Sequence, residues 1–377
     1  MRPTVLIFRK RLLPWSETFI AAQGRALERY RPVFVGYRLM RPGAAYLGDA
    51  RHVVLADHAL VPSLSKAALK TLGRVTPAWR RALESCEPAL LHTHFGLKPG
   101  PALAIARALG VPLVVTFHGM DITVERGSSR HRRDLDRLFR RASRILAVSR
   151  FIAEQLREAD CPEEKLVVHY IGVDTDRFSP GQPSARAPAR ILAVGRLVPK
   201  KGVVHLLRAM PRVRAVVPGA ELLIVGDGPL RRELEGQSRD LGAGARFLGV
   251  RTPDEVLDLI RTSTVFCAPF VVAPSGDAEG LGLTQLEAQA CGLPVVTSPS
   301  GGSVEALVHG ETGLISPAGD ADALADHLLA LLTDPERAAR FSRAAREHVL
   351  RSFDLRTQSR RLEEIYDEVV RGWSPGP

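Results

Sequence analysis

The stretch VFCAPFVVAPSGDAEGLGLTQLEAQACGLPVVT (Val265–Thr297) decides the fold class. It opens on a short apolar run, closes on another, and between them carries a glycine-rich loop and a helical segment, Leu283–Cys291. Two buried strands joined by a helix form a βαβ unit, and such a crossover makes the strands parallel. The stretch therefore predicts an α/β fold built on a parallel sheet.

The same alternation of apolar runs and helical patterns extends in both directions along the chain. The expected strands of the first half are Val5–Phe8, Val33–Tyr37, His52–Leu55, Leu90–Thr93, Leu113–Phe117, Arg144–Val148 and Val167–Tyr170. Those of the second half are Arg190–Val194, Glu221–Val225, Arg246–Leu248, Val265–Ala268 and Pro294–Thr297. Expected helices between them include Glu17–Tyr30, Gly100–Leu109, Gly202–Val217, Leu230–Leu241 and Pro253–Arg261. Two such blocks in series predict two Rossmann-like, doubly wound domains.

The segment SPGQPSARAPA (Ser179–Ala189) separates the two blocks. It is rich in Pro, Ser and Ala and has no periodic pattern, which is typical of an interdomain linker. We therefore expect an N-terminal domain over 1–180 and a C-terminal domain over 190–356. After Thr333 the pattern is helical to about Arg371, and we expect the helix over about 357–372 to pack back on the first domain.

Composition restricts the class of protein. The 377 residues suit two domains of ordinary size, and 45% hydrophobic residues can fill two cores. No apolar run reaches the roughly 20 residues that span a bilayer, and the first apolar run, followed by Pro14 and Glu17, is interpreted as a strand and not as a signal peptide. The four cysteines lie far apart and form no CxxC pair, so we expect neither disulfides nor a metal site and a cytoplasmic location.

The positive charge lies in the first half. Residues 1–180 hold 29 Lys and Arg against 17 Asp and Glu, whereas residues 181–377 hold 23 against 24. Arginines are densest between Arg126 and Arg150. A solvated, arginine-rich helix explains this run as well as an anionic membrane surface or an anionic acceptor does. Nucleic acid is disfavoured, because neither zinc-finger spacing nor an RNA-binding aromatic signature accompanies the charge.

Unusual residues follow the expected strands, at the sheet edge where open α/β sheets bind ligands. In the opening stretch, Glu279 precedes the turn Gly280-Leu281-Gly282, and Glu287 lies about one turn into the next helix. A glycine-rich turn at a helix N-terminus offers free N–H groups to a phosphate, and a nearby carboxylate can accept hydrogen bonds from ribose hydroxyls. The residues alone leave an ordinary loop with solvent-facing acids equally open.

Five segments of the second half resemble glycosyltransferase family 4, a family of retaining enzymes with the two-domain GT-B fold, in order and in spacing. They are VGRLVPKKG (Val194–Gly202), VGDGPL (Val225–Leu230), FLGVRTPDEV (Phe247–Val256), the E-x7-E segment with Glu279 and Glu287, and ACGLPVVTSPSGGSVEALVHGETGLI (Ala290–Ile315). The resemblance implies that two Rossmann-like domains face each other across a cleft that holds a nucleotide sugar.

The resemblance also implies roles for single residues. Arg196 and Lys201 would grip the donor diphosphate, and Glu279 would face the hydroxyls of the sugar. The remaining donor-site residues would be Gly280, Leu281 and Gly282 at the phosphate, Glu287 at the ribose, Val250 and Arg251 beside the base, and Gly226 in the loop after its strand.

The first half resembles the family more loosely. In place of a double-glycine loop it has RKRLLPWSETFIAAQ (Arg9–Gln23), which looks like the variant of exopolysaccharide and lipopolysaccharide group 1 transferases. Ser16 and Thr18 are then the candidate phosphate contacts. The motif FHGMD (Phe117–Asp121) resembles the acceptor-side motif of the family, and His118 would contact the transferred sugar or the acceptor. His94 and Asp121 are further acceptor-side candidates.

These features together predict a metal-independent hexosyltransferase without a cofactor. It would move a sugar, with retention, from a nucleoside-diphosphate sugar to a hydroxyl of a glycan, glycolipid or small natural product. A UDP-sugar is the favoured donor, and a GDP-sugar is the alternative. Peripheral contact of the basic first domain with the inner face of an anionic membrane is a further expectation. Two alternatives stay open: a GT-B phosphorylase or nucleotide-sugar epimerase, and a noncatalytic nucleotide-binding subunit.

Overall fold

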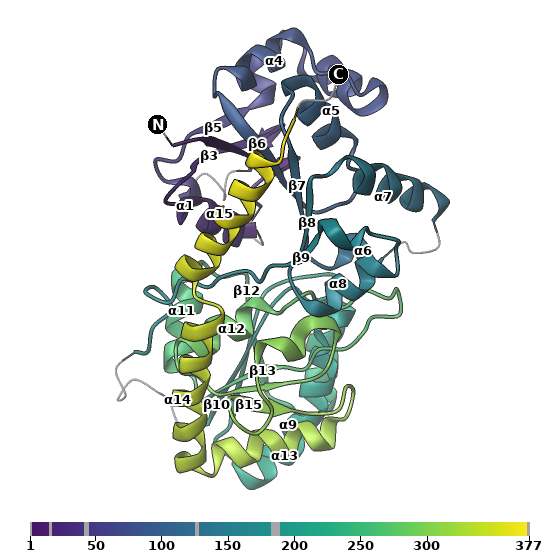
Figure 1. Ribbon diagram of the computed structural model, residues 1–377. Helices are drawn as coiled ribbons and strands as arrows, with labels where there is room; N and C mark the ends of the chain where they lie inside the picture. Colours follow the sequence, from purple (N-terminus) through teal and green to yellow (C-terminus); the bar gives the residue numbers. More distant parts are fainter. Residues whose placement is uncertain (1, 15–16, 41–44, 125–127, 182–188, 375–377) are drawn as a thin grey trace. The chain divides into compact units, whose positions relative to one another are not determined.

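A computed structural model describes residues 2–14, 17–40, 45–124, 128–181 and 189–374 (Figure 1). The chain divides into two compact units, residues 1–172 with 355–377, and residues 173–354. Unit 2 begins at Val173 and not after residue 180, because Val173 donates its N–H to Phe353 O (2.8 Å) and bridges to Asp354 at the other end of the unit.

Unit 1 is built on a seven-stranded sheet with the order β5-β3-β1-β6-β7-β8-β9, in which each pair of neighbouring strands is parallel. Its strands are β1 (Thr4–Phe8), β3 (Arg31–Gly36), β5 (His52–Val54), β6 (Pro88–His94), β7 (Leu113–Phe117), β8 (Arg144–Ala147) and β9 (Leu166–Val168). The two-residue strands β2 (Arg11–Leu12) and β4 (Arg38–Leu39) pair separately. The chain reverses its direction of winding beside β1, which lies between β3 and β6, so a ligand crevice is expected at the carboxyl end of β1.

Helices cover this sheet (Figure 1). They are α1 (Thr18–Arg25), α3 (Pro62–Ala67), α4 (Pro77–Glu84), α5 (Gly100–Leu109), α6 (Met120–Thr123), α7 (Ser129–Arg141), α8 (Arg150–Arg157) and α15 (Leu355–Arg371), with the short turns η2 (Leu55–His58), η3 (Ala68–Leu72) and η4 (Glu163–Lys165). Most of the described arginines of this run lie in α7, which buries Leu135, Leu138 and Phe139 on one side and leaves its arginines exposed. It is therefore an amphipathic surface helix with a basic outer face.

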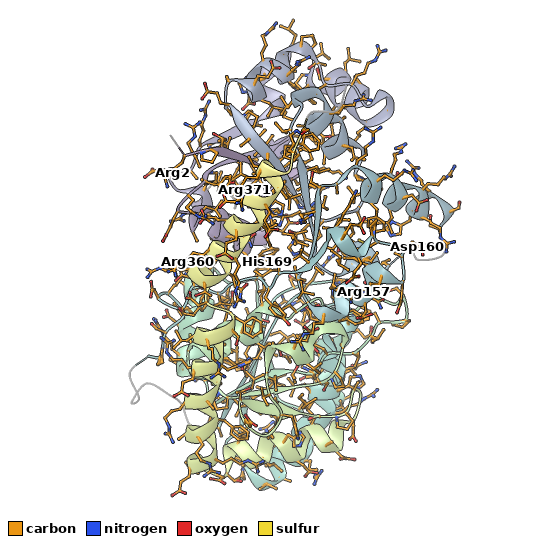
Figure 2. All side chains as sticks on the ribbon, in the orientation of Figure 1. Arg2, Arg157, Asp160, His169, Arg360 and Arg371 are labelled. Carbon is orange, nitrogen blue, oxygen red and sulfur yellow. The ribbon has the colours of Figure 1, made fainter. Side chains whose placement is uncertain are left out.

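The last helix, α15, is part of unit 1 and packs beside α1 (Figure 1). The buried Glu363 accepts hydrogen bonds from the backbone N–H groups of Arg29 (2.6 Å) and Tyr30 (3.2 Å), and the Tyr366 hydroxyl lies 2.6 Å from His92 Nδ1. His169, labelled in Figure 2, lies 2.9 Å through Nε2 from the Gln358 carbonyl. These buried polar contacts attach the end of the chain to the first sheet.

Unit 2 is built on a six-stranded parallel sheet with the order β12-β11-β10-β13-β14-β15. Its strands are β10 (Arg190–Val194), β11 (Glu221–Val225), β12 (Ala245–Gly249), β13 (Val265–Ala268), β14 (Val295–Thr297) and β15 (Gly313–Ile315). Its helices are α9 (Val203–Val216), α10 (Arg231–Asp240), α11 (Pro253–Thr262), α12 (Leu283–Ala290), α13 (Ala321–Leu332) and α14 (Pro335–Ser352), with the turns η6 (Pro199–Lys201) and η7 (Gly301–Ala306). Here the winding reverses beside β10, between β11 and β13.

Further details differ from the sequence expectation. The strand β15 was not predicted, because only three residues of it pair and glycine opens it. The helical pattern after Thr333 contains two helices, since α14 ends before Phe353 and α15 begins at Leu355. Within the part of the chain that the structure describes, no helix is both long and apolar enough to cross a membrane.

Candidate active site

The loop after β10 brings two lysines to the carboxyl edge of the second sheet. Gly202 has a φ of +61°, and a Cβ atom at this position would lie 1.8 Å from the Pro269 carbonyl oxygen. Only glycine fits such a close approach at a positive φ. The tight turn directs Lys201, whose ammonium group lies 4.7 Å from the centre of the Phe270 ring. Arg196, in the same loop, is exposed, and its guanidinium has no ion-pair partner among the described residues.

Both Lys200 and Lys201 lie beside the carboxylate of Glu279. Lys201 Nζ donates a hydrogen bond to Glu279 Oε2 (2.8 Å), and Lys200 Nζ lies 4.0 Å from the same oxygen while bonding Asp277 Oδ1 (3.1 Å). Burial alone would raise the pKa of Glu279, but the charges of Lys201 and Lys200 and the hydrogen bond from Lys201 outweigh it and hold the pKa below its usual value. The carboxylate is therefore ionised at neutral pH, as a group that accepts hydrogen bonds from sugar hydroxyls must be.

The turn Gly280-Leu281-Gly282 leads into α12. Gly282 has a φ of +82°, and a Cβ atom there would meet Gln285 Nε2 at 2.7 Å. No side chain among the described residues caps the helix, so its first N–H groups are open to a ligand. Gly280 and Leu281 are themselves buried, which leaves backbone groups as their contribution to any phosphate site.

Glu287 lies in α12 and differs from Glu279 in its electrostatics. Burial raises the pKa of its carboxyl to about 7, although the charge of Arg177 opposes the shift. Its carboxylate has no hydrogen-bond partner in the described part of the chain. An unsatisfied, half-buried carboxylate of this kind is suited to a ligand that supplies two hydroxyl donors, as a ribose does.

The loops after β11 and β12 complete the site in unit 2. Gly226, after β11, has a φ of +126°, and a Cβ atom there would lie 2.0 Å from the carbonyl oxygen of Gly195, so the loops after β10 and β11 touch. Gly226 also donates its N–H to Gly249 O (2.8 Å). Val250 and Arg251 follow at the end of β12, both exposed, with Arg251 only 3.8 Å from Glu255. The sequence-predicted donor residues of unit 2 thus line one edge of one sheet.

In unit 1, Asp121 joins the loops that follow β6 and β7. It is fully buried, and its carboxylate accepts from the N–H groups of Gly96 (2.9 Å), His118 (3.0 Å) and Gly119 (2.9 Å). Burial raises the pKa of Asp121, whereas these hydrogen bonds lower it. Because its oxygens are already occupied, Asp121 shapes the acceptor-side loops and does not itself offer a free oxygen to a ligand.

His94 and His118 form a stacked pair beside these loops. His94 Nδ1 lies 3.1 Å from His118 Nε2, and the rings of Phe95 and Phe19 pack on His118 with centroids 4.5 and 5.1 Å away. Burial, together with neighbouring histidines and Arg9, lowers both pKa values well below the usual histidine value. Both rings are therefore neutral at physiological pH, and one donates its N–H to the other.

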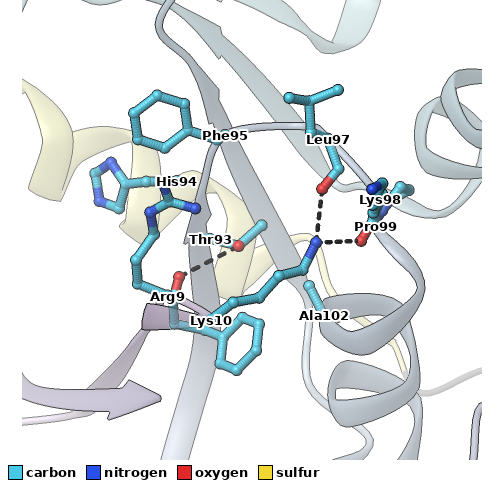
Figure 3. Close-up of a pocket in the computed structure, with 10 residues that line it drawn as sticks. Arg9, Lys10, Thr93, His94, Phe95, Leu97, Lys98, Pro99 and Ala102 are labelled. Carbon is cyan, nitrogen blue, oxygen red and sulfur yellow. Dashed lines mark hydrogen bonds between the residues drawn. The ribbon is translucent and has the colours of Figure 1, made fainter. Parts of the chain in front are cut away.

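Sequence reasoning missed the residues that occupy the carboxyl end of β1. Arg9 forms a two-point ion pair with Glu17 (2.7 and 2.5 Å) and lies 4.1 Å from the centre of the Phe95 ring. Lys10 donates to the carbonyls of Leu97 and Lys98, both at 2.8 Å, and burial lowers its pKa to about 8 (Figure 3). The run RKR directly after the first strand was the available signal. Two cations at this strand end are suited to an anionic group such as a phosphate.

The structure describes the SETF segment from Glu17 onward. Ser16 lies outside the described residues, whereas Thr18 begins α1 and is half-buried. Glu17 is buried and holds Arg9. The acidic residue of the segment therefore positions the arginine of the preceding loop.

Among the described residues, no cluster of three or more His, Cys, Asp and Glu side chains is arranged to hold a metal ion.

Two parallel α/β sheets, each with cations beside its strand reversal, have the architecture of the GT-B glycosyltransferases. Residues 6–177 match the family model described as Glycosyltransferase Family 4, and residues 174–348 match Glycosyl transferases group 1. The chain belongs to glycosyltransferase family 4.

Relatives found by sequence agree with this membership, and a solved structure shares the fold. The chain is 38% identical over 61% of its length to the GDP-mannose-dependent alpha-(1-6)-phosphatidylinositol monomannoside mannosyltransferase of Mycolicibacterium smegmatis, and it spans 64% of that relative. It is 32% identical over 74% of its length to the amylovoran biosynthesis glycosyltransferase AmsK of Erwinia amylovora, of which it spans 69%. The crystal structure of Anabaena HepE with UDP and glucose shares the fold, with a TM-score of 0.79, 19% identity and coverage of 97% of this chain and 100% of HepE.

Proposed function

We propose that this protein is a retaining glycosyltransferase that moves a sugar from a nucleoside-diphosphate sugar to a hydroxyl of a glycan or glycolipid. One observation carries the proposal: Lys201 and Glu279 form a 2.8 Å ion pair next to the uncapped N-terminus of α12. The lysine and the helix end suit a leaving diphosphate, and the carboxylate suits the hydroxyls of the sugar.

Each residue has a part in this reaction. Arg196, exposed and without an ion-pair partner among the residues described, would move onto the diphosphate together with Lys201. Glu287 would accept hydrogen bonds from the ribose. The base would lie against Val250 and Arg251. In unit 1 the neutral His118, oriented by His94, would contact the sugar or the acceptor, and Arg9 would add positive charge to the phosphates.

Retention follows from a reaction on one face of the sugar. The bond from the anomeric carbon to the diphosphate oxygen breaks while the acceptor hydroxyl attacks from the same side, through an oxocarbenium-like transition state. A phosphate oxygen takes the proton of the acceptor, so no protein base is needed. Lys201, Arg196 and the helix N-terminus stabilise the departing charge, which makes a divalent cation unnecessary in this scheme.

The names of the relatives suggest which substrates to test first. The Mycolicibacterium relative is named as GDP-mannose-dependent and the Erwinia relative as an amylovoran biosynthesis enzyme, so GDP-mannose is the first donor and an envelope glycan or phosphoglycolipid the first acceptor. UDP-sugars are the second donor class. The four free, buried cysteines suit the reducing cytoplasm, where we place the reaction, at the inner face of the membrane.

A donor panel tests the proposal. Thermal unfolding with GDP-mannose, UDP-glucose, UDP-N-acetylglucosamine and the free nucleotides should reveal a donor that stabilises the chain, by about 2.7 kcal/mol at a hundred times its dissociation constant. Epimerisation of that donor without acceptor, or sugar-phosphate formation from inorganic phosphate, would replace the transferase by one of the alternative enzymes. Failure of every nucleotide to bind would indicate a noncatalytic subunit. An inverted anomeric centre in the product, measured by NMR, would contradict retention.

A further inference from the structure

Two ion pairs lie close together in unit 2, where the loop after β10 meets the segment that follows β13. Lys201 Nζ lies 2.8 Å from Glu279 Oε2, and Lys200 Nζ lies 3.1 Å from Asp277 Oδ1. All four side chains are mostly buried, with 14% to 22% of their surface exposed, so solvent and salt screen their charges only in part. The first pair takes part in the proposed reaction, and the second pair borders it.

Lys200 is held by the residues that directly precede Glu279. Its Nζ donates to Asp277 Oδ1 (3.1 Å) and to the Ala278 carbonyl oxygen (3.2 Å), and it lies 4.0 Å from Glu279 Oε2. An ammonium group has three N–H donors, so these two contacts use most of its capacity. A distance of 4.0 Å is too long for a hydrogen bond. Lys200 therefore lies beside Glu279 without being bonded to it.

This arrangement leaves one oxygen of Glu279 open. Lys201 bonds Oε2, and the approach of Lys200 is to the same oxygen. Within the part of the chain that the structure describes, Oε1 accepts no hydrogen bond. An ionised carboxylate accepts hydrogen bonds at both of its oxygens, so Oε1 can accept from a sugar hydroxyl. A second lysine bonded to Glu279 would compete with that hydroxyl.

We propose that Asp277 is a positioning residue for the donor sugar, because it holds Lys200 away from Glu279 and so keeps Oε1 open to sugar hydroxyls. Without the Asp277 carboxylate, the charge of Lys200 would be drawn to Glu279, which lies 4.0 Å away. The inference rests on the proposed function, since it requires Glu279 to face the sugar. Direct contact between Asp277 and the sugar is the alternative, and the two differ in what removal of Lys200 does.

Calorimetric titration of the full-length protein tests the proposal, with GDP-mannose compared with GDP and UDP-glucose compared with UDP. Asp277→Ala should weaken binding of the nucleotide sugar at least about tenfold, because a hydrogen bond to a charged group contributes roughly ten- to a hundredfold. Its affinity for the free nucleotide should be no weaker than that of the wild type, since the free nucleotide has no sugar. The matched control is Asp326→Ala, which removes the carboxylate partner of Arg212 elsewhere in unit 2 and should change neither affinity.

A double variant separates positioning from direct contact. Lys200→Met/Asp277→Ala also removes the competing cation, so most of the affinity for the nucleotide sugar should return. Asp277→Glu keeps the negative charge and should bind the nucleotide sugar more tightly than Asp277→Ala does. A double variant as weak as Asp277→Ala would overturn the proposal, and so would an Asp277→Ala protein that binds like the wild type. A wild type that binds none of the nucleotide sugars would overturn the proposed function as well, whereas the other failures would leave it standing.

Discussion

At the scale of single residues, substitutions in the ion pair of Lys201 and Glu279 should distinguish its contribution to the stability of the fold from its contribution to turnover. Lys201→Ala should remove a cation from the leaving diphosphate and leave Glu279 largely buried without its closest counterion. We expect at least a hundredfold loss of kcat, corresponding to about 3 kcal/mol, and a loss of unfolding free energy of about 1–3 kcal/mol. Steady-state kinetics and chemical denaturation measure the two effects.

A second variant distinguishes the two roles of the pair. Lys201→Met/Glu279→Gln removes both charges together, so the folded protein should recover most of its stability because no uncompensated charge stays in the site. Turnover should remain low, since the leaving group still lacks its cation. Recovery of turnover in the double variant would show that the pair serves the fold and not the reaction.

The raised pKa of Glu287 predicts that the stability of the protein depends on pH. Its pKa, raised to about 7 by burial, means that the folded state binds a proton more tightly than the unfolded state does. Stability from this group is therefore full below the ordinary carboxyl pKa and is lost as the pH rises toward 7. Glu287→Gln should be more stable than the wild type by about 3 kcal/mol at pH 8 and indistinguishable from it near pH 4. Denaturation at both pH values provides the measurement, and equal differences at the two would contradict the assignment.

At the scale of elements, the turn from β10 into α9 depends on a glycine. Gly202→Ala places a methyl group against the Pro269 carbonyl at a φ of +61°, so the loop that carries Lys201 must move. We expect a loss of at least about 2 kcal/mol of unfolding free energy and a fall in nucleotide affinity. Gly219→Ala is the matched control, because nothing lies within 4 Å of its added Cβ atom. Both variants can be compared by thermal unfolding, and a Gly202 variant as stable as the control would refute the constraint.

The sequence predicted elements well where hydrophobic runs were long enough. All seven strands of the first main sheet coincide with apolar runs, and the central strands β1, β6 and β7 are buried along most of their length, as a sheet covered on both faces requires. The strand β15 has no such signal, since three residues beginning with glycine look like loop. In unit 2 a motif fixes the spacing of Glu279 and Glu287, so the sequence could place these candidate residues, and their roles at a donor stay predictions. The ion pair of Arg9 with Glu17 could not be predicted, because it depends on how two segments eight residues apart fold together.

At the scale of the whole molecule, the chain passes from unit 1 to unit 2 and returns to unit 1. This order predicts which unit a substitution in the last helix destabilises. Tyr366 of α15 is fully buried in the core of unit 1, 193 residues beyond Val173, where unit 2 begins. Tyr366→Ala should create a cavity and remove the hydrogen bond to His92, which costs about 3–5 kcal/mol. Because the contacts of α15 described above all lie in unit 1, amide exchange should accelerate in β1, β6 and β7 and stay unchanged in β10, β11 and β13. Phe341→Ala, a large side chain of the core of unit 2, should give the reverse pattern. Equal acceleration in both sheets after either substitution would mean that the two units unfold as one.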